Sequence, residues 1–164
     1  MITALASILS LAVLIPPPPA PPPPPPSLRA QVQGTWRLVS YESSTTEGKT
    51  WFERFGDDVL GYLLYDSTGH MMVEFEKQPP PAKNSSGDDW NPTADEARTA
   101  YLGYVAYFGT YTVDETAHAV IHHVQGSLNP SYFGTDQVRP AKLDGDRLTL
   151  SDGKTFRVVW ERVR

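Results

Sequence analysis

Residues 59–76 read VLGYLLYDSTGHMMVEFE, and this stretch decides the fold. An apolar and aromatic run is followed by the turn sequence DSTG, whose glycine is free to adopt a positive φ. Beyond the turn, apolar and polar side chains alternate, which places Met71, Val73 and Phe75 on one face. Two such runs around a short turn predict an antiparallel β-hairpin with one buried face.

The same strand character continues on both sides of this hairpin. Upstream, Gly34–Tyr41 predicts a first strand with Trp36 and Leu38 on one face and Tyr41 on the other. Downstream, the pairs DG at 144–145 and DG at 152–153 are strong hairpin signals between alternating runs. The downstream strands are expected at 107–113, 119–126, 134–143, 147–150 and 154–163.

One short helix interrupts the strands, at about 94–104. Thr93 and Glu96 have the spacing of a capping box, and apolar residues follow at helical intervals. The pattern contains no alternation of strands with helices, so a parallel sheet is not expected. We therefore predict an all-β fold, an antiparallel up-and-down barrel of about eight strands with one short helix, with a β-sandwich as the competing architecture.

The first 31 residues are expected to lie outside this domain. Ile2–Ile15 is apolar and uncharged, too short to span a bilayer comfortably, and of the length of a signal-peptide core. The proline tracts that follow predict an extended spacer, although a ligand for a proline-recognising domain or a misassigned start codon are alternatives. A cleavage site is expected near Ala20 or at Leu28-Arg29-Ala30. This interpretation gives a domain at 32–164, a periplasmic or secreted location, and no stable membrane span after processing.

Composition excludes several classes of function. The net charge is −5 and the 14 basic residues are scattered, which argues against a nucleic-acid partner. The chain has no cysteine, so thiol nucleophiles and cysteine metal sites are excluded. Phosphate-binding loops, dinucleotide-binding fingerprints and His-Glu-x-x-His zinc motifs are also missing from the sequence. We therefore predict no metal, no cofactor and no assignable catalytic residue.

The chain resembles a known family in several segments. Gly34-Thr35-Trp36 is similar to the Gly-x-Trp opening of lipocalins. Further matching segments are GTWRLVSYE at 34–42, YDSTGHMMVEFE at 65–76, YFGTYTVDE at 107–115, the long segment 122–150 and WER at 160–162. Together they resemble the small lipocalin-like domain family of bacteria and fungi, a calycin-type barrel, over roughly 32–164. The Pro-rich loop at 77–91 departs from that pattern.

The resemblance implies structural roles for three residues, but it implies no single activity. In lipocalins an arginine near the end of the last strand lies across the tryptophan, and Arg162 and Arg164 are placed for this role. We assign Gly34, Trp36 and Arg162 to structure, with Trp36 closing one end of the barrel. Function must be argued from the site, because a fold does not determine it.

Five residues are candidates for contacts with a ligand. His122 and His123 are adjacent on a strand and must face opposite sides of the sheet, so one of them points into the barrel. Arg139 shares a face with Leu143 and is expected inside, where it would bind an anion or form an internal salt bridge to Asp136, Glu74 or Asp114. Tyr107 and Tyr111 would offer apolar walls and a hydroxyl, or pack as core.

Three hypotheses follow. The favoured one is binding of a small hydrophobic or amphipathic ligand inside the barrel. The second is an enzyme of isomerase or cyclase type, which a hydrogen-bonded inward pair of His123 and Tyr111 would favour. The third is a structural envelope domain whose barrel is filled by its own side chains. The oligomeric state is left open.

Overall fold

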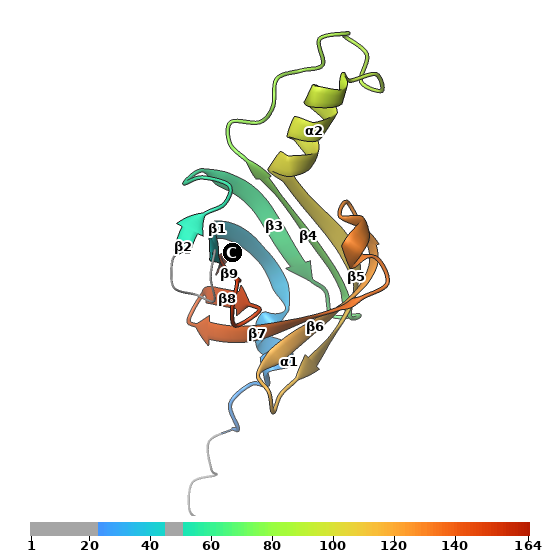
Figure 1. Cartoon of the computed structure of the whole chain (residues 1–164). Helices are drawn as coiled ribbons and strands as arrows, with labels where there is room; N and C mark the ends of the chain where they lie inside the picture. Colours follow the sequence, from blue (N-terminus) through green and yellow to red (C-terminus); the bar gives the residue numbers. More distant parts are fainter. Residues whose placement is uncertain (1–22, 45–50) are drawn as a thin grey trace, which may run out of the picture.

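The computed structural model describes residues 23–44 and 51–164, and its strands form a closed antiparallel barrel (Figure 1). Consecutive strands pair along the chain, and β1 pairs with β9 to close the ring. The eight barrel strands are β1 (Gly34–Ser44), β3 (Val59–Tyr65), β4 (His70–Lys77), β5 (Tyr104–Asp114), β6 (Ala119–Ser127), β7 (Asp136–Asp144), β8 (Arg147–Ser151) and β9 (Phe156–Arg162). This confirms the predicted up-and-down barrel. The short strand β2 (Trp51–Glu53) pairs with β1 and was not predicted.

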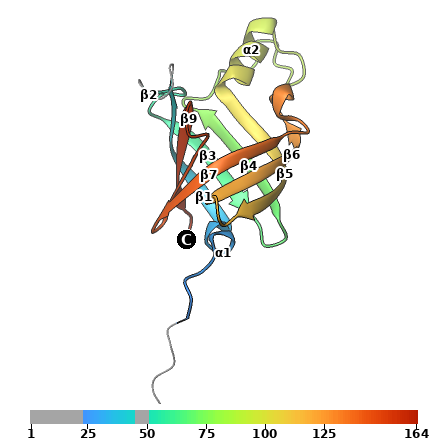
Figure 2. The ribbon, with the colours of Figure 1, turned by 60° about the horizontal axis from the view of Figure 1, so that its bottom comes forward.

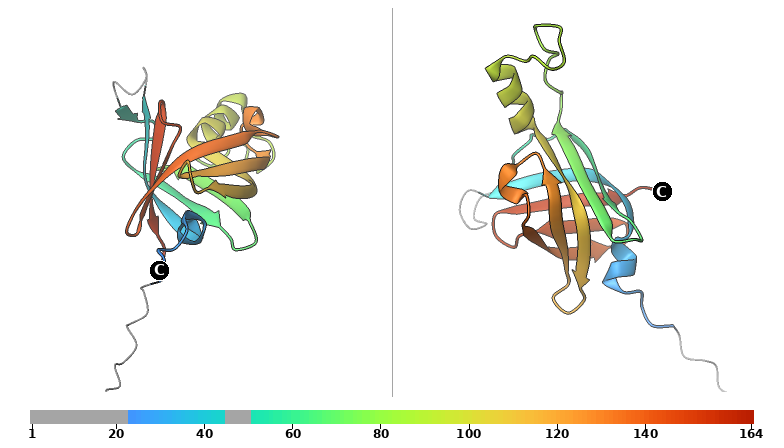
Figure 3. Two further views of the ribbon diagram at one scale, coloured as in Figure 1. Left: turned by 90° about the horizontal axis from the view of Figure 1, so that it is seen from below. Right: turned by 90° about the vertical axis from the view of Figure 1, so that its right-hand side faces the viewer.

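The predicted helix is confirmed as α2 (Ala94–Gly103), which projects from one end of the barrel (Figure 1). Its capping box is complete: the Glu96 amide donates to Thr93 Oγ1 at 3.3 Å, and the Thr93 amide donates to Glu96 Oε2 at 2.7 Å. A one-turn 3₁₀-helix, η1 (Pro130–Tyr132), follows β6. The two views of Figure 3 place η1 at the same end of the barrel as α2.

A second α-helix, α1 (Leu28–Val32), covers the opposite end and was not predicted (Figure 2). Leu28 and Val32 are buried in the core, and the backbone amides of Leu28 and Arg29 donate to the Glu115 carboxylate in the turn between β5 and β6. The packed unit therefore includes 28–31, which composition assigns to the spacer. Cleavage at Leu28-Arg29-Ala30 would cut through this helix.

The remainder of the N-terminal prediction falls outside the described residues. The apolar run Ile2–Ile15 and the first proline tract belong to 1–22. Among the helices of the described part of the chain, none has the length and apolar character needed to cross a membrane.

One face assignment in β1 is corrected by the structure. Strict alternation places Tyr41 on the opposite face from Trp36, but the pairing of β1 with β9 shifts register between Leu38 and Ser40. A β-bulge of this kind adds one residue and reverses the alternation beyond it. Tyr41 consequently turns inward, where its ring lies 5.1 Å from the Phe55 ring.

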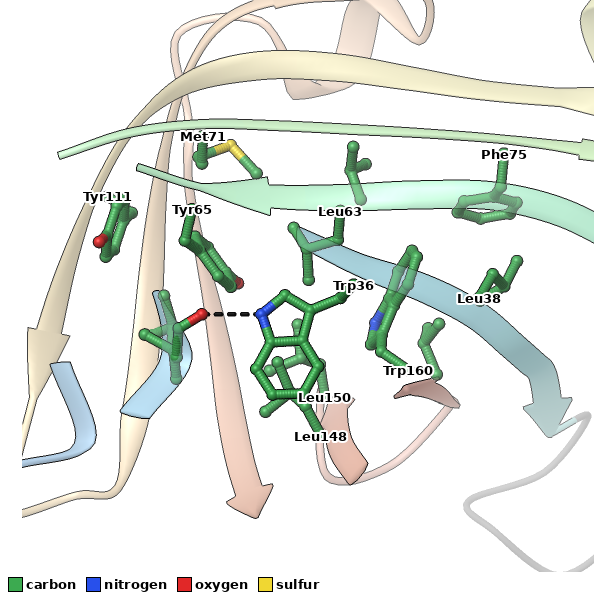
Figure 4. Packing of buried hydrophobic residues seen from close by; sticks show 14 of the residues in the cluster. Trp36, Leu38, Leu63, Tyr65, Met71, Phe75, Tyr111, Leu148, Leu150 and Trp160 are labelled. Carbon is green, nitrogen blue, oxygen red and sulfur yellow. Dashed lines mark hydrogen bonds between the residues drawn. The ribbon is translucent and has the colours of Figure 1, made fainter. Parts of the chain in front are cut away.

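Trp36 lies in the core at the end of the barrel next to α1 (Figure 4). Its side chain is fully buried, and its indole N–H donates to the carbonyl oxygen of Val32 at 2.7 Å. The Arg162 guanidinium lies over the Trp36 ring at 4.1 Å and donates to the carbonyl oxygen of Gln33 at 2.8 Å. Gly34 has a φ of +126°, and a Cβ there would lie 3.1 Å from Arg162 Nη1, so a side chain is disfavoured on both counts.

Candidate functional site

A cavity of about 320 Å³ lies inside the barrel, toward the end that carries α2 and η1. Its mouth is bordered by Tyr101 and Leu102 of α2 and by residues that follow β6. Its walls are mainly aromatic and aliphatic, and include Tyr41, Phe55, Phe75, Tyr132, Phe156 and Val158. The volume lies in the range of small-molecule sites in proteins. The cavity argues against the third hypothesis, in which the barrel is filled by its own side chains.

His122 is the centre of a buried polar cluster at the cavity. It is 1% exposed, and its Nε2 lies 2.6 Å from the Tyr65 hydroxyl while its Nδ1 lies 3.0 Å from the Tyr107 hydroxyl. Burial lowers the pKa of His122 to about 3, and the nearby charge of Arg139 acts in the same direction. The imidazole is therefore neutral at pH 7 and can donate only one hydrogen bond.

The two tyrosines that contact His122 keep their protons. Burial raises the pKa of Tyr107 to about 12, although the neighbouring Arg139 charge opposes this rise. Burial likewise raises the pKa of Tyr65 well above its ordinary value. Tyr107 lines the cavity, whereas Tyr65 lies behind His122 and is not on the cavity wall. The cluster thus presents neutral hydroxyl and imidazole groups rather than charges.

Arg139 is the buried charged side chain of the site, and Arg54, which is exposed, also lines the cavity. Arg139 is 7% exposed, lies on the cavity wall, and stacks over the Phe156 ring with 4.8 Å between the guanidinium carbon and the ring centroid. Its Nη2 donates to Gln137 Oε1 at 3.0 Å, and its Nη1 makes a longer contact of 3.4 Å to the carbonyl oxygen of Val138. The inward orientation of Arg139 is as expected from the sequence.

The internal salt bridge considered for Arg139 does not form to any carboxylate of the described residues. The three expected partners are engaged elsewhere. Asp136 accepts from His123, Glu74 from the Tyr104 hydroxyl, and Asp114 from backbone amides of the β5–β6 turn. The guanidinium of Arg139 has five N–H donors and lies on the cavity wall, where a ligand can accept from it.

Two of the predicted contact residues do not reach the cavity. His123 faces outward, as one of the adjacent pair must, and contacts Asp136 at 2.7 Å and Thr112 at 2.9 Å. Tyr111 is buried but donates to the carbonyl oxygen of Asp66 at 2.8 Å. It follows Tyr107 by four residues on β5, which moves it about 13 Å toward the closed end.

Sequence reasoning missed Tyr65 and Gln137 as members of the site. Tyr65 ends the apolar run of β3 and meets His122 only because strands far apart in the sequence face each other across the barrel. The alternation of β7 does place Gln137 on the face of Arg139, and this signal identifies the residue that holds the guanidinium. No group of three or more His, Cys, Asp or Glu side chains capable of holding a metal occurs among the described residues.

The chain is similar to a protein family and, over a shorter stretch, to one individual protein. A family model described as a lipocalin-like domain matches residues 33–163. Over an alignment of 65 residues the chain is 38% identical to the 4′-hydroxy-3′-methoxypropiophenone carrier protein of Aspergillus oryzae, and the alignment covers 36% of this chain and 59% of that protein. The similarity therefore spans less than two thirds of that relative.

Proposed function

Because the chain belongs to the lipocalin-like domain family, we propose that its barrel binds a small, largely hydrophobic ligand in the cavity. The observation that carries this proposal is the cavity of about 320 Å³, whose wall is mainly aromatic and aliphatic side chains. Tyr107, His122 and Arg139 meet at its buried side, and Arg54, Ser127 and Asn129 add further polar groups to the lining. Apolar walls with a few convergent polar groups are typical of small-molecule sites. At about 30 Å³ per water molecule, the space equals roughly ten waters, which suits a ligand of one or two rings.

The curated relative supports a carrier role and an aromatic ligand. Its name describes a carrier of a substituted aromatic ketone, a molecule with one ring and a few polar oxygens. The aromatic walls of the cavity, including Phe75, Phe156 and Tyr132, suit such a ring through offset or edge-to-face contacts. We accordingly infer a carrier for an aromatic, amphipathic compound of this general kind.

The test uses two valine-to-phenylalanine variants at contrasting places on the barrel. Val158 lines the cavity, whereas Val138 is 52% exposed on the outer face. N-phenyl-1-naphthylamine, a neutral dye that brightens in apolar surroundings, should bind the natural chain with one site and be displaced by 4′-hydroxy-3′-methoxypropiophenone. Val158→Phe should weaken dye binding at least tenfold, and Val138→Phe should leave it unchanged. No saturable binding to the natural chain, or equal effects of the two variants, would contradict the proposal.

A second candidate function is proton transfer on the bound ligand, as in an isomerase. It is favoured by the hydrogen bond between Tyr107 and His122, which lie beside Arg139. The sequence led us to expect such a histidine–tyrosine pair, but between His123 and Tyr111. Yet a general acid or base works best with a pKa near the working pH. The pKa values of about 12 for Tyr107 and about 3 for His122 are far from neutrality, which favours binding over catalysis. Exchange of the α-hydrogens of the same ketone in D₂O, followed by NMR, should not be accelerated by the protein.

The proposal also includes export to the periplasm or the exterior. Its support is the uncharged apolar run at 2–15 followed by prolines. Expression of the full chain with a C-terminal tag, followed by cell fractionation and N-terminal sequencing, tests it. A mature chain that begins between Ala20 and Ser27, with α1 intact, is the expected product. Retention of the uncleaved chain in the cytosol would contradict export.

A further inference from the structure

The polar end of the cavity contains more hydrogen-bond donors than acceptors, and Arg139 contributes most of them. A guanidinium has five N–H groups. That of Arg139 donates to Gln137 Oε1 and to the carbonyl oxygen of Val138, and it also forms a hydrogen bond with the Tyr107 hydroxyl oxygen. Gln137 is itself held, because its amide nitrogen donates to Thr135 Oγ1 at 2.6 Å and so turns its oxygen toward Arg139. The arginine is thus positioned rather than neutralised.

Hydrogen-bond counting assigns a second donor to the same place. Tyr65 is buried off the cavity wall, and in the described part of the chain its hydroxyl contacts His122 Nε2. To satisfy its O–H it must donate to that nitrogen, since an unsatisfied buried donor is costly. The neutral imidazole then carries its hydrogen on Nδ1 and donates it to the Tyr107 oxygen. The hydroxyl hydrogen of Tyr107 is left without an acceptor from the cluster, at the wall of the cavity.

We propose that the ligand is a monoanion of one or two rings whose oxyanion, a carboxylate or phenolate, accepts hydrogen bonds from Arg139 and Tyr107. This inference rests on the proposed function and specifies the chemistry of its ligand. A buried charge requires a partner, and here no carboxylate of the described chain lies within ion-pair distance of Arg139. An oxyanion accepts hydrogen bonds without donating any, so it complements a site composed of donors.

The rest of the ligand is directed toward the mouth. Phe156 lies under the guanidinium, and Tyr132 contacts the Tyr107 ring edge-on with 5.8 Å between ring centroids. A ring attached to the oxyanion would lie between these aromatic side chains, which face the same cavity. The outward cluster of His123 and Asp136 has no part in this site.

The first experiment compares two probes of equal shape, 2-naphthoate and 2-naphthamide, by isothermal titration calorimetry at pH 7. The natural chain should bind naphthoate at least tenfold more tightly than naphthamide. Arg139→Gln should abolish this preference by weakening naphthoate binding while naphthamide binding is retained, and Arg139→Lys should restore part of it. Arg37→Gln is the matched control, because Arg37 forms an ion pair with Glu161 on the outer face and the change in net charge is the same.

The second experiment reads the ionisation of the ligand directly and does not depend on the fold of an arginine variant. 4-Nitrophenol absorbs at a longer wavelength as the phenolate. At a fixed, slightly acidic pH, binding to the natural chain should increase the phenolate absorbance, and Tyr107→Phe should reduce both the affinity and this increase. Near-ultraviolet circular dichroism confirms that each variant is folded.

The outcomes separate the two levels of the proposal. Equal affinity for naphthoate and naphthamide, unaffected by Arg139→Gln, together with no phenolate signal, overturns the anionic ligand but leaves a cavity that binds neutral compounds. Saturable binding of neither these probes nor N-phenyl-1-naphthylamine overturns the proposed function itself. If Arg37→Gln and Arg139→Gln lose naphthoate affinity equally, the effect comes from the overall charge of the protein. This result would also overturn the proposal that Arg139 binds an oxyanion in the cavity.

Discussion

The two ends of the barrel both bury polar side chains, but they satisfy them differently. At the closed end, Trp36 donates to the carbonyl oxygen of Val32, and Tyr111 donates to that of Asp66. At the open end, Arg139 and Tyr107 have donors that the described residues do not fully satisfy. The chain therefore supplies its own acceptors where it closes the barrel and leaves them to another molecule where the cavity lies.

This difference separates stability from binding. Fully satisfied and tightly packed groups stabilise the fold, whereas buried donors without acceptors destabilise it until a ligand completes them. Substitutions at the closed end should accordingly lower the free energy of unfolding. Substitutions at the open end should act mainly on ligand affinity.

The largest effect is expected for Trp36→Ala at the closed end. Loss of this fully buried indole leaves a cavity, and should lower the free energy of unfolding by about 3–5 kcal/mol. Leu102→Ala, at the exposed mouth, should change it by less than about 0.5 kcal/mol. Urea unfolding followed by far-ultraviolet circular dichroism measures both. Similar losses for the two variants would remove the distinction between the ends.

The next effect concerns pH. The folded chain holds His122 neutral with a pKa of about 3, whereas the unfolded chain takes up a proton near pH 6.5. Between these values the unfolded state binds more protons, so the stability contributed by neutral His122 is full above pH 6.5 and is lost as pH falls toward 3. The expected slope is about 1.4 kcal/mol per pH unit.

His122→Gln isolates this slope from the titration of the carboxylates. The free energies of unfolding of the natural chain and of this variant are measured in urea from pH 7 to pH 4. Below pH 6.5, the natural chain should lose about 1.4 kcal/mol per pH unit relative to the variant as the pH falls. His123→Gln, on the outer face, is the control and should retain the slope of the natural chain. A difference that does not depend on pH would show that His122 is not held neutral.

A smaller effect distinguishes the two tyrosines that contact the same imidazole. Tyr65→Phe should leave His122 Nε2 buried without a partner and destabilise the fold by about 1–3 kcal/mol. Tyr107→Phe should destabilise it less, because water in the cavity can reach Nδ1, yet it should weaken binding of 2-naphthoate. Urea unfolding and calorimetry on both variants provide the comparison. The reverse order of stabilities would contradict the assigned hydrogen-bond directions.

The smallest effect is expected at α2, beside the mouth. Thr93→Ala removes the capping box and should destabilise this helix by about 1 kcal/mol. Since α2 buries none of its residues, the unfolding midpoint of the barrel should not move. Hydrogen exchange followed by mass spectrometry should show faster exchange within 94–103 alone. A lower midpoint for the whole chain would show that α2 stabilises the barrel.

Local patterns were sufficient for much of the fold. Alternation and Asp-Gly turns predict the β3–β4 hairpin and the strands that follow, and the capping box predicts α2. Alternation also predicts that His122 and His123 face opposite sides and that Arg139 faces inward. Each of these predictions depends on residues within a few positions of one another.

Local patterns failed where the structure depends on distant contacts. The five residues of α1 are too few to predict a helix, which packs against the core through Leu28 and Val32. The bulge in β1 follows from its pairing with β9, so no local signal indicates that Tyr41 turns inward. The depth of Tyr111 along the barrel likewise depends on which end is closed.

By itself, the sequence determined the class of fold, the order of the strands, that His122 and His123 lie on opposite sides of the sheet, and that Arg139 faces inward. Those properties follow from backbone periodicity and turn chemistry, which act over short distances along the chain. The tertiary structure alone decided that a cavity remains, that Tyr65 and Tyr107 contact His122, and that Arg139 lacks a carboxylate among the described residues. These properties arise only when closure of the barrel brings strands from distant parts of the chain to face one another, and they are the ones on which binding depends.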